Sequence, residues 1–149
     1  MADAETYRPS KILGLMARSL MLPTASPAGP GVAAEPAGGI SVTYVGHATV
    51  LVRLDGATLL TDPVYSSRLV LPKRLVAPGV ALEALPPLDV VLVSHGHMDH
   101  LDVPTHHRLP KRGTVAVVAK NLSGLIAGAG YAEVIELAWG DSILVKGVR

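Results

Sequence analysis

The chain has 149 residues, which is enough for one domain and too few for two. Hydrophobic residues make up 49% of it and charged residues 17%, so the composition excludes a disordered charged tail, which would lack the apolar surface to offset chain entropy. The 13 Lys and Arg nearly balance the 12 Asp and Glu, so no overall field attracts nucleic acid or an anionic membrane. Cysteine is absent, so any bound metal must be held by His and carboxylate side chains.

Residues 1–39 are expected to form a short amphipathic helix followed by a linker. Arg18 interrupts the apolar stretch, and Asp3 and Glu5 stand where a signal peptide would be positively charged, so we expect a cytoplasmic protein. No apolar run approaches the roughly 20 residues that span a bilayer, so no transmembrane segment is expected. Residues 23–39 contain four Pro and four Gly, the composition of a linker.

The folded domain is expected to occupy residues 40–149. Seven segments have the composition of strands: 40–45, 49–54, 57–61, 89–94, 114–119, 132–137 and 141–145. Asp55-Gly56 is a favoured hairpin loop. Helices are expected over 104–109 and over 122–129, the second one capped by Asn121. Hairpins followed by strands that alternate with helices predict an α/β layered fold with a mixed β-sheet.

A dense cluster of potential metal ligands follows the strand expected at 89–94, with three His and two Asp within eight residues. Imidazole and carboxylate groups suit Zn²⁺, Fe²⁺ or Mn²⁺. In an extended loop, His95 and His97 point to the same side and can chelate one ion. Asp99 and His100 fall on the next turn and can reach a second ion nearby. The alternative is a solvated loop in which the histidines satisfy one another, which this density disfavours.

The pattern His-x-His-x-Asp-His at residues 95–100 resembles the motif of the metallo-β-lactamase fold superfamily. Three other segments, 45–52 with Gly-His-Ala-Thr, 60–68 with Thr-Asp-Pro, and 85–89, resemble one branch of it. That branch holds the N-acyl-phosphatidylethanolamine phospholipase D-like and L-ascorbate-6-phosphate lactonase-like hydrolases. The resemblance covers residues 40–147. It implies the N-terminal half of an αββα sandwich, with helices on one face of a mixed sheet.

The resemblance also implies a site for two zinc ions, with iron or manganese as other possible metals. His95 and His97 would ligate the first ion, and Asp99 and His100 the second. Asp99 could also accept the proton of the attacking water. Asp62 corresponds to the aspartate of the first motif, which supports the histidine loop from behind the ligands. Its alternative role is that of a turn residue ahead of a proline.

Other polar residues near the motif have two interpretations. His47, at a strand end, would line the site in this branch or would be a structural histidine. Asp102 would either orient His100 or cap the helix that follows it, and the cap is favoured. His106 and His107 are expected on an exposed helix face, without a chemical role.

Members of the family carry three further ligands downstream: a His for the first ion, an Asp that bridges both ions, and a last His. No histidine follows His107 in this chain. The expectation is therefore an N-terminal fragment, incomplete at its C-terminus, with weak metal binding. The sheet face that the missing C-terminal half would cover is expected to be bare, and self-association through it is the expected result.

The resemblance implies a zinc-dependent hydrolase in which a metal-bound hydroxide attacks an ester, lactone or phosphodiester of a small-molecule or lipid-like substrate. We expect this activity to be weak in the present chain. One alternative is a catalytically incomplete module that binds a metal or a partner. Another is a nuclease of the same superfamily, which the near-neutral charge and the lack of a basic stripe disfavour.

Overall fold

The computed structural model describes residues 9–26, 39–69 and 71–149, which fall into two compact units. The smaller unit consists of residues 1–27 and 67–77, and the larger unit of residues 28–66 and 78–149. Most of the linker expected over 23–39 lies outside the described residues.

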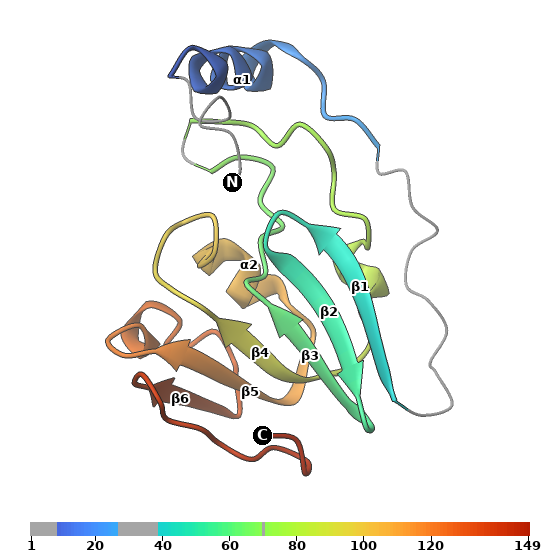
Figure 1. Ribbon diagram of the computed structural model, residues 1–149, viewed down its shortest axis with the longest axis vertical. Coiled ribbons are helices and arrows are strands. Elements are labelled where there is room, and N and C mark those ends of the chain that lie inside the picture. The colour runs from blue at the N-terminus through green and yellow to red at the C-terminus, as the bar shows by residue number, and fades with distance from the viewer. Residues whose placement is uncertain (1–8, 27–38, 70) are drawn as a thin grey trace, which may run out of the picture. The chain divides into compact units, whose positions relative to one another are not determined.

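The larger unit is built on one six-stranded mixed sheet, which confirms the predicted α/β fold class (Figure 1). Its strands are β1 (Ile40–Gly46), β2 (Thr49–Leu54), β3 (Ala57–Thr61), β4 (Leu88–Val93), β5 (Lys111–Ala119) and β6 (Glu133–Leu137). They lie in the sheet in chain order. The first three strands are antiparallel neighbours, and each pair from β3 to β6 is parallel. The sheet therefore begins as a meander and continues as a parallel sheet.

The turn between β2 and β3 has the predicted hairpin geometry. Asp55 and Gly56 both have positive φ angles, 48° and 83°, which the favoured two-residue hairpin turn requires. Leu54 pairs with Ala57 directly across this turn. The turn thus sets the register that places Leu51 beside Leu60, both of them fully buried.

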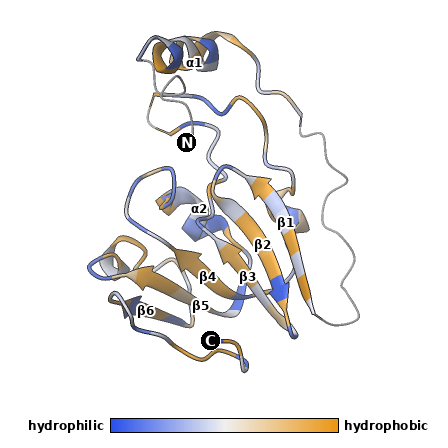
Figure 2. Ribbon diagram, viewed as in Figure 1, coloured by the Kyte–Doolittle hydropathy of each residue, from blue (hydrophilic) through white to orange (hydrophobic). Residues whose placement is uncertain are grey.

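One face of the sheet carries the hydrophobic core. Two clusters of buried side chains form it: Val45, Leu51, Leu60, Val80, Leu82, Leu85, Leu88, Val91 and Leu109 in the first, and Val93, Leu101, Ala116, Val118, Ile126 and Ala129 in the second. Helix α2 (Val103–Arg108) joins β4 to β5 and confirms the helix expected over 104–109. Hydropathy colouring shows how apolar residues dominate the strands (Figure 2).

The opposite face of the sheet is partly covered by the C-terminal segment, residues 141–149. This face and the C-terminal segment together line a hollow of about 230 Å³. Leu59 and Leu92 line it from the sheet, and Ile143 lines it from the segment. Lys146 pairs with Asp89 of β4, with Nζ 2.6 Å from Oδ1. The face predicted to be bare is therefore only partly exposed.

Two predictions are wrong: that residues 141–145 form a strand, and that residues 122–129 form a helix. Asp141 caps a turn by accepting a hydrogen bond from the backbone N–H of Ala138 at 2.8 Å, and Val145 then pairs with Val148 in a tight turn instead of with the sheet. Only a single 3-10 turn, η3 (Ser123–Leu125), forms in place of the helix. Three glycines lie in or directly after this segment, and the positive φ angles of Gly128 and Gly130 end any helical run. Asn121 itself has a positive φ of 68° and does not cap the turn.

His106 is fully buried, so the exposed position predicted for it is wrong, whereas its neighbour His107 is exposed as expected. The Nδ1 atom of His106 lies 2.6 Å from the Tyr131 hydroxyl, and Lys111 donates a hydrogen bond to the His106 carbonyl. In the described part of the chain, Nε2 of His106 has no hydrogen-bond partner. Helix α2 is only six residues long, and the side that carries His106 packs inward. Burial, followed by the charge of Lys111, lowers the pKa of His106 to about 4.

We predict that His106 makes the stability of the protein depend on pH. The folded-state pKa of about 4 lies below the ordinary value of 6.5, so the unfolded chain takes up a proton first as the pH falls. The free energy of unfolding should therefore be highest and constant above pH 6.5. It should fall by about 3 kcal/mol as the pH is lowered from 6.5 to about 4. Urea unfolding of the protein and of His106→Gln at several pH values measures this slope. His107→Gln is the matched control, and an unchanged slope in His106→Gln would contradict the assignment.

The smaller unit contains helix α1 (Pro9–Met21), which confirms the predicted N-terminal helix. The chain that follows it pairs with residues 67–77: the backbone N–H of Ala25 donates to the Leu75 carbonyl at 2.8 Å, and that of Ala77 donates to the Ala25 carbonyl at 2.9 Å. Among the described residues, no helix has both the length and the apolar character needed to cross a membrane.

Candidate metal centre

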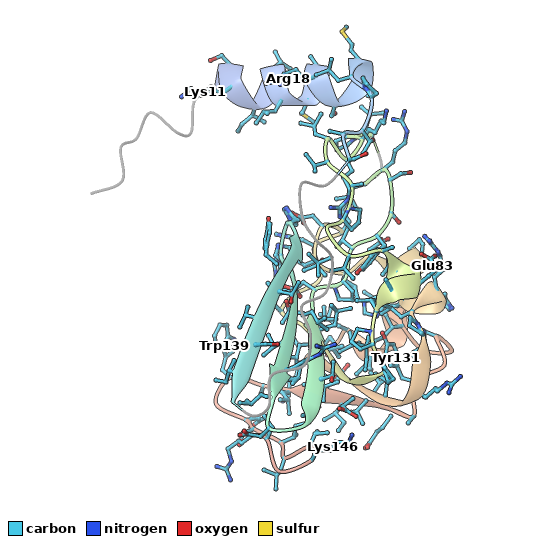
Figure 3. The ribbon with its side chains drawn as sticks, turned by 90° about the vertical axis from the view of Figure 1, so that its right-hand side faces the viewer. Lys11, Arg18, Glu83, Tyr131, Trp139 and Lys146 are labelled. Atoms are coloured by element: carbon cyan, nitrogen blue, oxygen red, sulfur yellow. The ribbon has the colours of Figure 1, made fainter. Side chains whose placement is uncertain are left out.

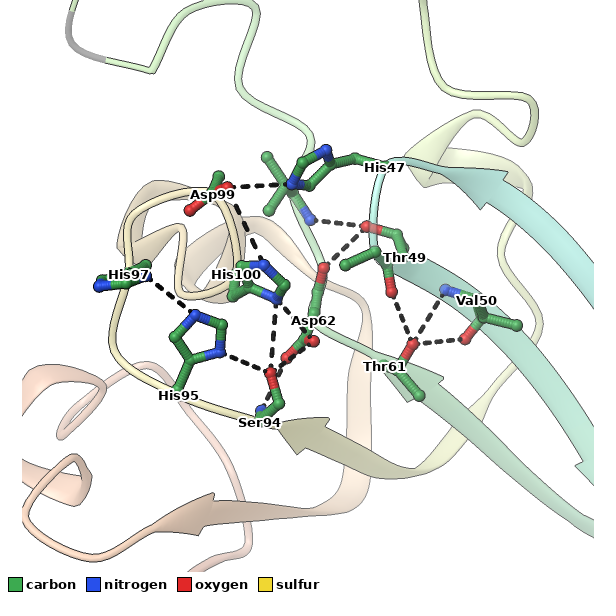
Figure 4. A network of polar contacts seen from close by, with 12 residues as sticks. His47, Thr49, Val50, Thr61, Asp62, Ser94, His95, His97, Asp99 and His100 are labelled. Atoms are coloured by element: carbon green, nitrogen blue, oxygen red, sulfur yellow. Dashed lines mark hydrogen bonds and ion pairs between the residues drawn. The ribbon is translucent and has the colours of Figure 1, made fainter. Parts of the chain in front are cut away.

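The predicted site residues converge where three strands end. Because β1 and β3 are each antiparallel to β2, and β3 is parallel to β4, these three strands run in the same direction and their carboxyl ends share one edge of the sheet. His47 follows β1, Asp62 follows β3, and Ser94 follows β4. In parallel sheets this edge is where ligands bind. Figure 4 shows the resulting network of side chains.

The carboxylate of Asp62 is the hub of this network. One oxygen accepts a hydrogen bond from the Ser94 backbone N–H at 2.7 Å, and the other lies 2.8 Å from the Ser94 hydroxyl and 2.9 Å from Nδ1 of His100 (Figure 4). Only 7% of Asp62 is exposed, and its φ angle is positive at 37°. Its carbonyl accepts a hydrogen bond from the buried Thr49 hydroxyl at 2.7 Å. The structure thus places Asp62 behind the histidine loop, where it contacts a candidate ligand directly.

His95 and His97 form the first candidate ligand pair. Nε2 of His95 and Nδ1 of His97 lie 3.0 Å apart, and the two ring centroids are separated by 4.6 Å in an edge-on arrangement. The Ser94 hydroxyl lies 3.0 Å from Nδ1 of His95, so the other ring nitrogen faces His97. The spacing i, i+2 therefore brings the two rings to one side, as the sequence predicts.

Asp99 and His100 form the second candidate pair, and His47 joins them. The contact of His100 Nδ1 with Asp62 leaves Nε2 facing Asp99, 3.9 Å from Oδ2. Nε2 of His47 lies 3.1 Å from the same oxygen. The three donor atoms all lie within 4.8 Å of one another. Partial burial opposes ionisation of Asp99, but hydrogen bonds from its own backbone and from His47, and then the charges of His100 and His47, hold its pKa below the usual range.

His47 reaches Asp99 because of an unusual backbone conformation. Its φ angle is 56°, in the left-handed region that residues other than glycine rarely adopt, and it follows Gly46 at φ 145°. A register shift interrupts the β1–β2 ladder at this point, between Tyr44 and Gly46. Half of the His47 side chain remains exposed, at 49%. The turn thus directs an accessible imidazole toward Asp99.

Asp102 lies apart from these ligands. It stands at the N-cap position of α2, but its carboxylate makes no capping bond to the helix backbone. Instead it accepts hydrogen bonds from the Ser66 backbone at 2.9 Å, from the Ser66 hydroxyl at 2.8 Å and from the Thr105 hydroxyl. Asp102 therefore occupies the predicted cap position and binds Thr105, but through the Thr105 side chain and not its backbone. It also anchors the segment after β3 to α2, because the Tyr65 and Ser66 N–H groups and the Ser66 hydroxyl donate to this buried carboxylate.

Ser94 belongs to the network although no role was predicted for it. Its backbone and hydroxyl both bind Asp62, and the hydroxyl also contacts Nδ1 of His95. The available signal was its position: a polar residue that directly follows the apolar run of residues 90–93 and directly precedes the first histidine of the motif.

The donor atoms fit a first-row divalent metal ion. In a tetrahedral zinc site with bonds of about 2.0 to 2.1 Å, neighbouring nitrogen ligands lie about 3.3 Å apart. The 3.0 Å between His95 and His97 and the 3.1 and 3.9 Å around Asp99 bracket this value. The carboxylate behind His100 fixes the tautomer and the ring orientation, as carboxylates do behind metal-ligating histidines. The donor set contains no sulfur, and imidazole with carboxylate suits zinc, iron or manganese equally.

The model of the β-lactamase superfamily domain matches residues 57–149, which is more than half of the chain. The chain therefore belongs to this family. An uncharacterized protein of Mycobacterium tuberculosis is 45% identical over 83 residues, a match that covers 52% of this chain and 22% of that protein. A metal-dependent hydrolase of Anaeromyxobacter sp. is 38% identical over 96 residues, which covers 63% of this chain and 32% of that hydrolase.

An N-acyl-phosphatidylethanolamine-hydrolyzing phospholipase D of Caenorhabditis elegans is 40% identical over 116 residues, a match that covers 70% of this chain and 33% of that enzyme. This chain thus spans about a fifth to a third of the length of these curated relatives.

Solved structures share the fold. An isothiocyanate hydrolase from gut bacteria of Delia radicum superposes with a TM-score of 0.55 over 68% of this chain and 43% of its own, at 24% identity. A diiron β-hydroxylase from Streptomyces venezuelae superposes with a TM-score of 0.50 over 68% of this chain and 21% of its own, at 28% identity. The predicted metallo-β-lactamase fold is confirmed, and one of these neighbours holds iron.

We predict that removing the Asp62 carboxylate weakens metal binding without abolishing it. In Asp62→Ala, His100 loses the partner that orients it, which should lower metal affinity about 10- to 100-fold. The Ser94 N–H also loses its acceptor, which should lower the free energy of unfolding by about 1 to 3 kcal/mol. Competition with a chromophoric chelator and urea unfolding measure the two effects. The exposed Glu83→Ala is the control, and a complete loss of binding, equal to that in His97→Ala, would show that Asp62 is itself a ligand.

Proposed function

We propose that this chain carries the metal-binding part of a hydrolase with a two-metal centre. The observation that carries the proposal is the pair of donor sets, His95 with His97 and Asp99 with His100, held at one sheet edge by the buried Asp62 carboxylate. Membership in the β-lactamase superfamily and the 38% identity to a metal-dependent hydrolase support it. We propose zinc as the native metal, with iron or manganese as the alternatives that the same donors accept.

Within this proposal, His95 and His97 would hold the first ion and Asp99 and His100 the second. When bound, the ions would supply Lewis-acid chemistry, activating a water and polarising the scissile group. Asp99 is ionised and its side chain is 40% exposed, so its carboxylate could also accept a proton from water during the reaction. Asp62 would not touch the substrate and would act by fixing the His100 ring.

His47 would be a third protein donor beside Asp99 and His100. Its Nε2 lies closer to Asp99 than His100 does, at 3.1 Å against 3.9 Å. Catalytic zinc sites normally have three protein ligands and one open position. The second donor set would meet this number within the described residues, whereas the first has two histidines. We therefore propose that the second position binds metal more tightly than the first in this chain.

The space beside the site supports one class of substrate. A hollow of about 750 Å³ borders His95 and Asp62 and extends over Leu92, Val117 and Leu137, on the face of the sheet that residues 141–149 partly cover. A scissile group at the histidines would thus have apolar surface next to it, which suits a substrate with a hydrocarbon portion. We propose an ester, lactone or phosphodiester with such a portion, in line with the 40% identity to a phospholipase D.

A second candidate function is a module that binds metal or a partner without catalysis. The observation that favours it is the first donor set, in which two histidines alone would hold an ion. Such an ion would bind weakly and position water poorly. The two candidates differ in a measurable way, because only the first predicts metal-dependent turnover.

We predict that His95→Ala with His97→Ala lowers the metal content of the purified protein by up to one ion per chain, measured by plasma emission, because the first position loses both of its protein ligands. His107→Ala, which changes an exposed histidine outside the site, should leave the metal content unchanged. Equal metal content in the double variant and in the unchanged protein would refute the ligand assignment.

We expect the unchanged protein, reconstituted with zinc, iron or manganese in turn, to hydrolyse bis(p-nitrophenyl) phosphate or a p-nitrophenyl ester slowly, and the double variant to be inactive. Turnover that does not respond to metal would refute the hydrolase proposal. Metal binding without turnover on any of these substrates would favour the binding module.

A further inference from the structure

The smaller unit presents an apolar surface that has no part in the metal centre. Leu13 and Met21 of α1 are 70% and 84% exposed, and Ser19 is the one buried residue of this helix. The exposed large apolar side chains of the unit, among its described residues, are Ile12, Leu13, Leu15, Met16, Leu20, Met21, Leu22, Leu71 and Val76. Contiguous exposed apolar surface of this kind marks an interaction site.

Helix α1 is amphipathic. Ile12, Met16 and Leu20 recur every four residues and share one side of the helix. Lys11 and Arg18 are seven residues apart and share another side, and both are exposed (Figure 3). The helix therefore combines an apolar face with a basic one, and within the described residues the apolar face is left exposed.

The smaller unit is also strongly basic. Residues 1–27 and 67–77 contain six Lys or Arg and two Asp or Glu, a net charge of +4, and the described part, 9–26 and 67–77, contains no Asp or Glu and five basic residues: Lys11, Arg18, Arg68, Lys73 and Arg74. The larger unit contains seven Lys or Arg and ten Asp or Glu. The net charge of +1 for the whole chain thus conceals a separation of charge between the two units.

The second segment of the unit, residues 67–77, is tied to the chain that leaves α1. Nζ of Lys73 donates to the Leu22 carbonyl at 3.2 Å, and the Thr24 hydroxyl donates to the Arg74 carbonyl at 2.8 Å. Leu71 and Val76 are therefore presented by the same compact unit as the helix. The basic and apolar groups of both segments thus belong to one compact unit.

We propose that this surface, α1 with residues 67–77, docks onto an anionic lipid bilayer. An amphipathic helix with Lys and Arg on its polar side and Leu, Ile and Met on the other lies in the plane of the membrane interface. Basic side chains near such a membrane bind the anionic headgroups while their methylenes stay on apolar surface. A second copy of the chain is the weaker candidate, because it would bring two surfaces of five positive charges together. The proposal is independent of the metal centre.

The proposal is tested by co-sedimentation of the full chain with vesicles of phosphatidylcholine alone and of phosphatidylcholine mixed with phosphatidylserine. Binding should require phosphatidylserine and weaken as salt is raised, since the Debye length falls from about 10 Å at 0.1 M to about 3 Å at 1 M. Each basic residue near the membrane contributes about 1 kcal/mol, or about fivefold in affinity, so Lys11→Gln with Arg18→Gln should weaken binding about 25-fold. Leu13→Ser with Met21→Ser should weaken it about tenfold or more.

Matched variants in the larger unit control for charge and hydropathy. Arg108→Gln with Arg112→Gln removes two exposed basic residues, and Leu144→Ser removes an apolar side chain that is 67% exposed. Neither should change vesicle binding, and circular dichroism should show that all variants keep their secondary structure. The proposal is overturned if the chain does not sediment with vesicles that contain phosphatidylserine, or if the control variants and the α1 variants lose vesicle binding equally. Self-association that Leu13→Ser with Met21→Ser abolishes, without any vesicle binding, would assign the surface to a second copy instead.

Discussion

One buried carboxylate organises the candidate site. Asp62 directly follows β3, and its carboxylate binds both the backbone N–H and the hydroxyl of Ser94, the first residue after the neighbouring strand β4. The same carboxylate orients the His100 ring, so a single side chain joins two strand ends to the ligand loop. A buried carboxylate is costly unless its oxygens are satisfied, and here three donors satisfy them. The loop is thereby held in one geometry before any ligand arrives.

The arrangement explains why the loop can be polar and accessible yet ordered. His95 and Asp99 are only partly exposed, while His97 faces solvent. The carbonyl of His97 accepts backbone hydrogen bonds from His100 and Leu101, at 2.9 and 2.7 Å, which closes the loop into a turn. Leu101 is buried and anchors the end of this turn in the core. Preorganised donors of this kind avoid the ordering cost that a flexible loop would meet on binding.

Local patterns predicted most of the sheet and the closeness of the His95 and His97 rings. The Asp55-Gly56 turn, the apolar run of β4 and the i, i+2 spacing of the histidines each depend on neighbouring residues alone, and each was correct. The error at His106 concerns a long-range contact. His106 is buried against Tyr131, which lies 25 residues away in the sequence, and no local pattern around residues 103–108 predicts this contact.

The same distinction holds for the candidate site. The role of Asp102 depends on the donors of Ser66, which lie far from it in sequence. The contact between His47 and Asp99 joins residues 52 positions apart. It requires His47 to adopt a left-handed backbone conformation, which the sequence around His47 does not predict. The wrong prediction of a helix over 122–129 has a local cause. The sequence itself contains the glycines that prevent the helix, and their effect is stronger than that of the helical spacing of apolar residues.

The strand order has a consequence for how the larger unit folds during synthesis. Each strand pairs with the strand directly before it in the chain, so every addition to the sheet closes a loop to the most recent element. All the candidate ligands lie between residues 47 and 100, ahead of β5. During synthesis, which releases the N-terminal part first, β1 to β4 can assemble while later residues are still being added. The contact between Asp62 and Ser94 can therefore form on the ribosome once β4 has been made, whereas Leu101, at the end of the ligand loop, packs only when β5 supplies Ala116 and Val118.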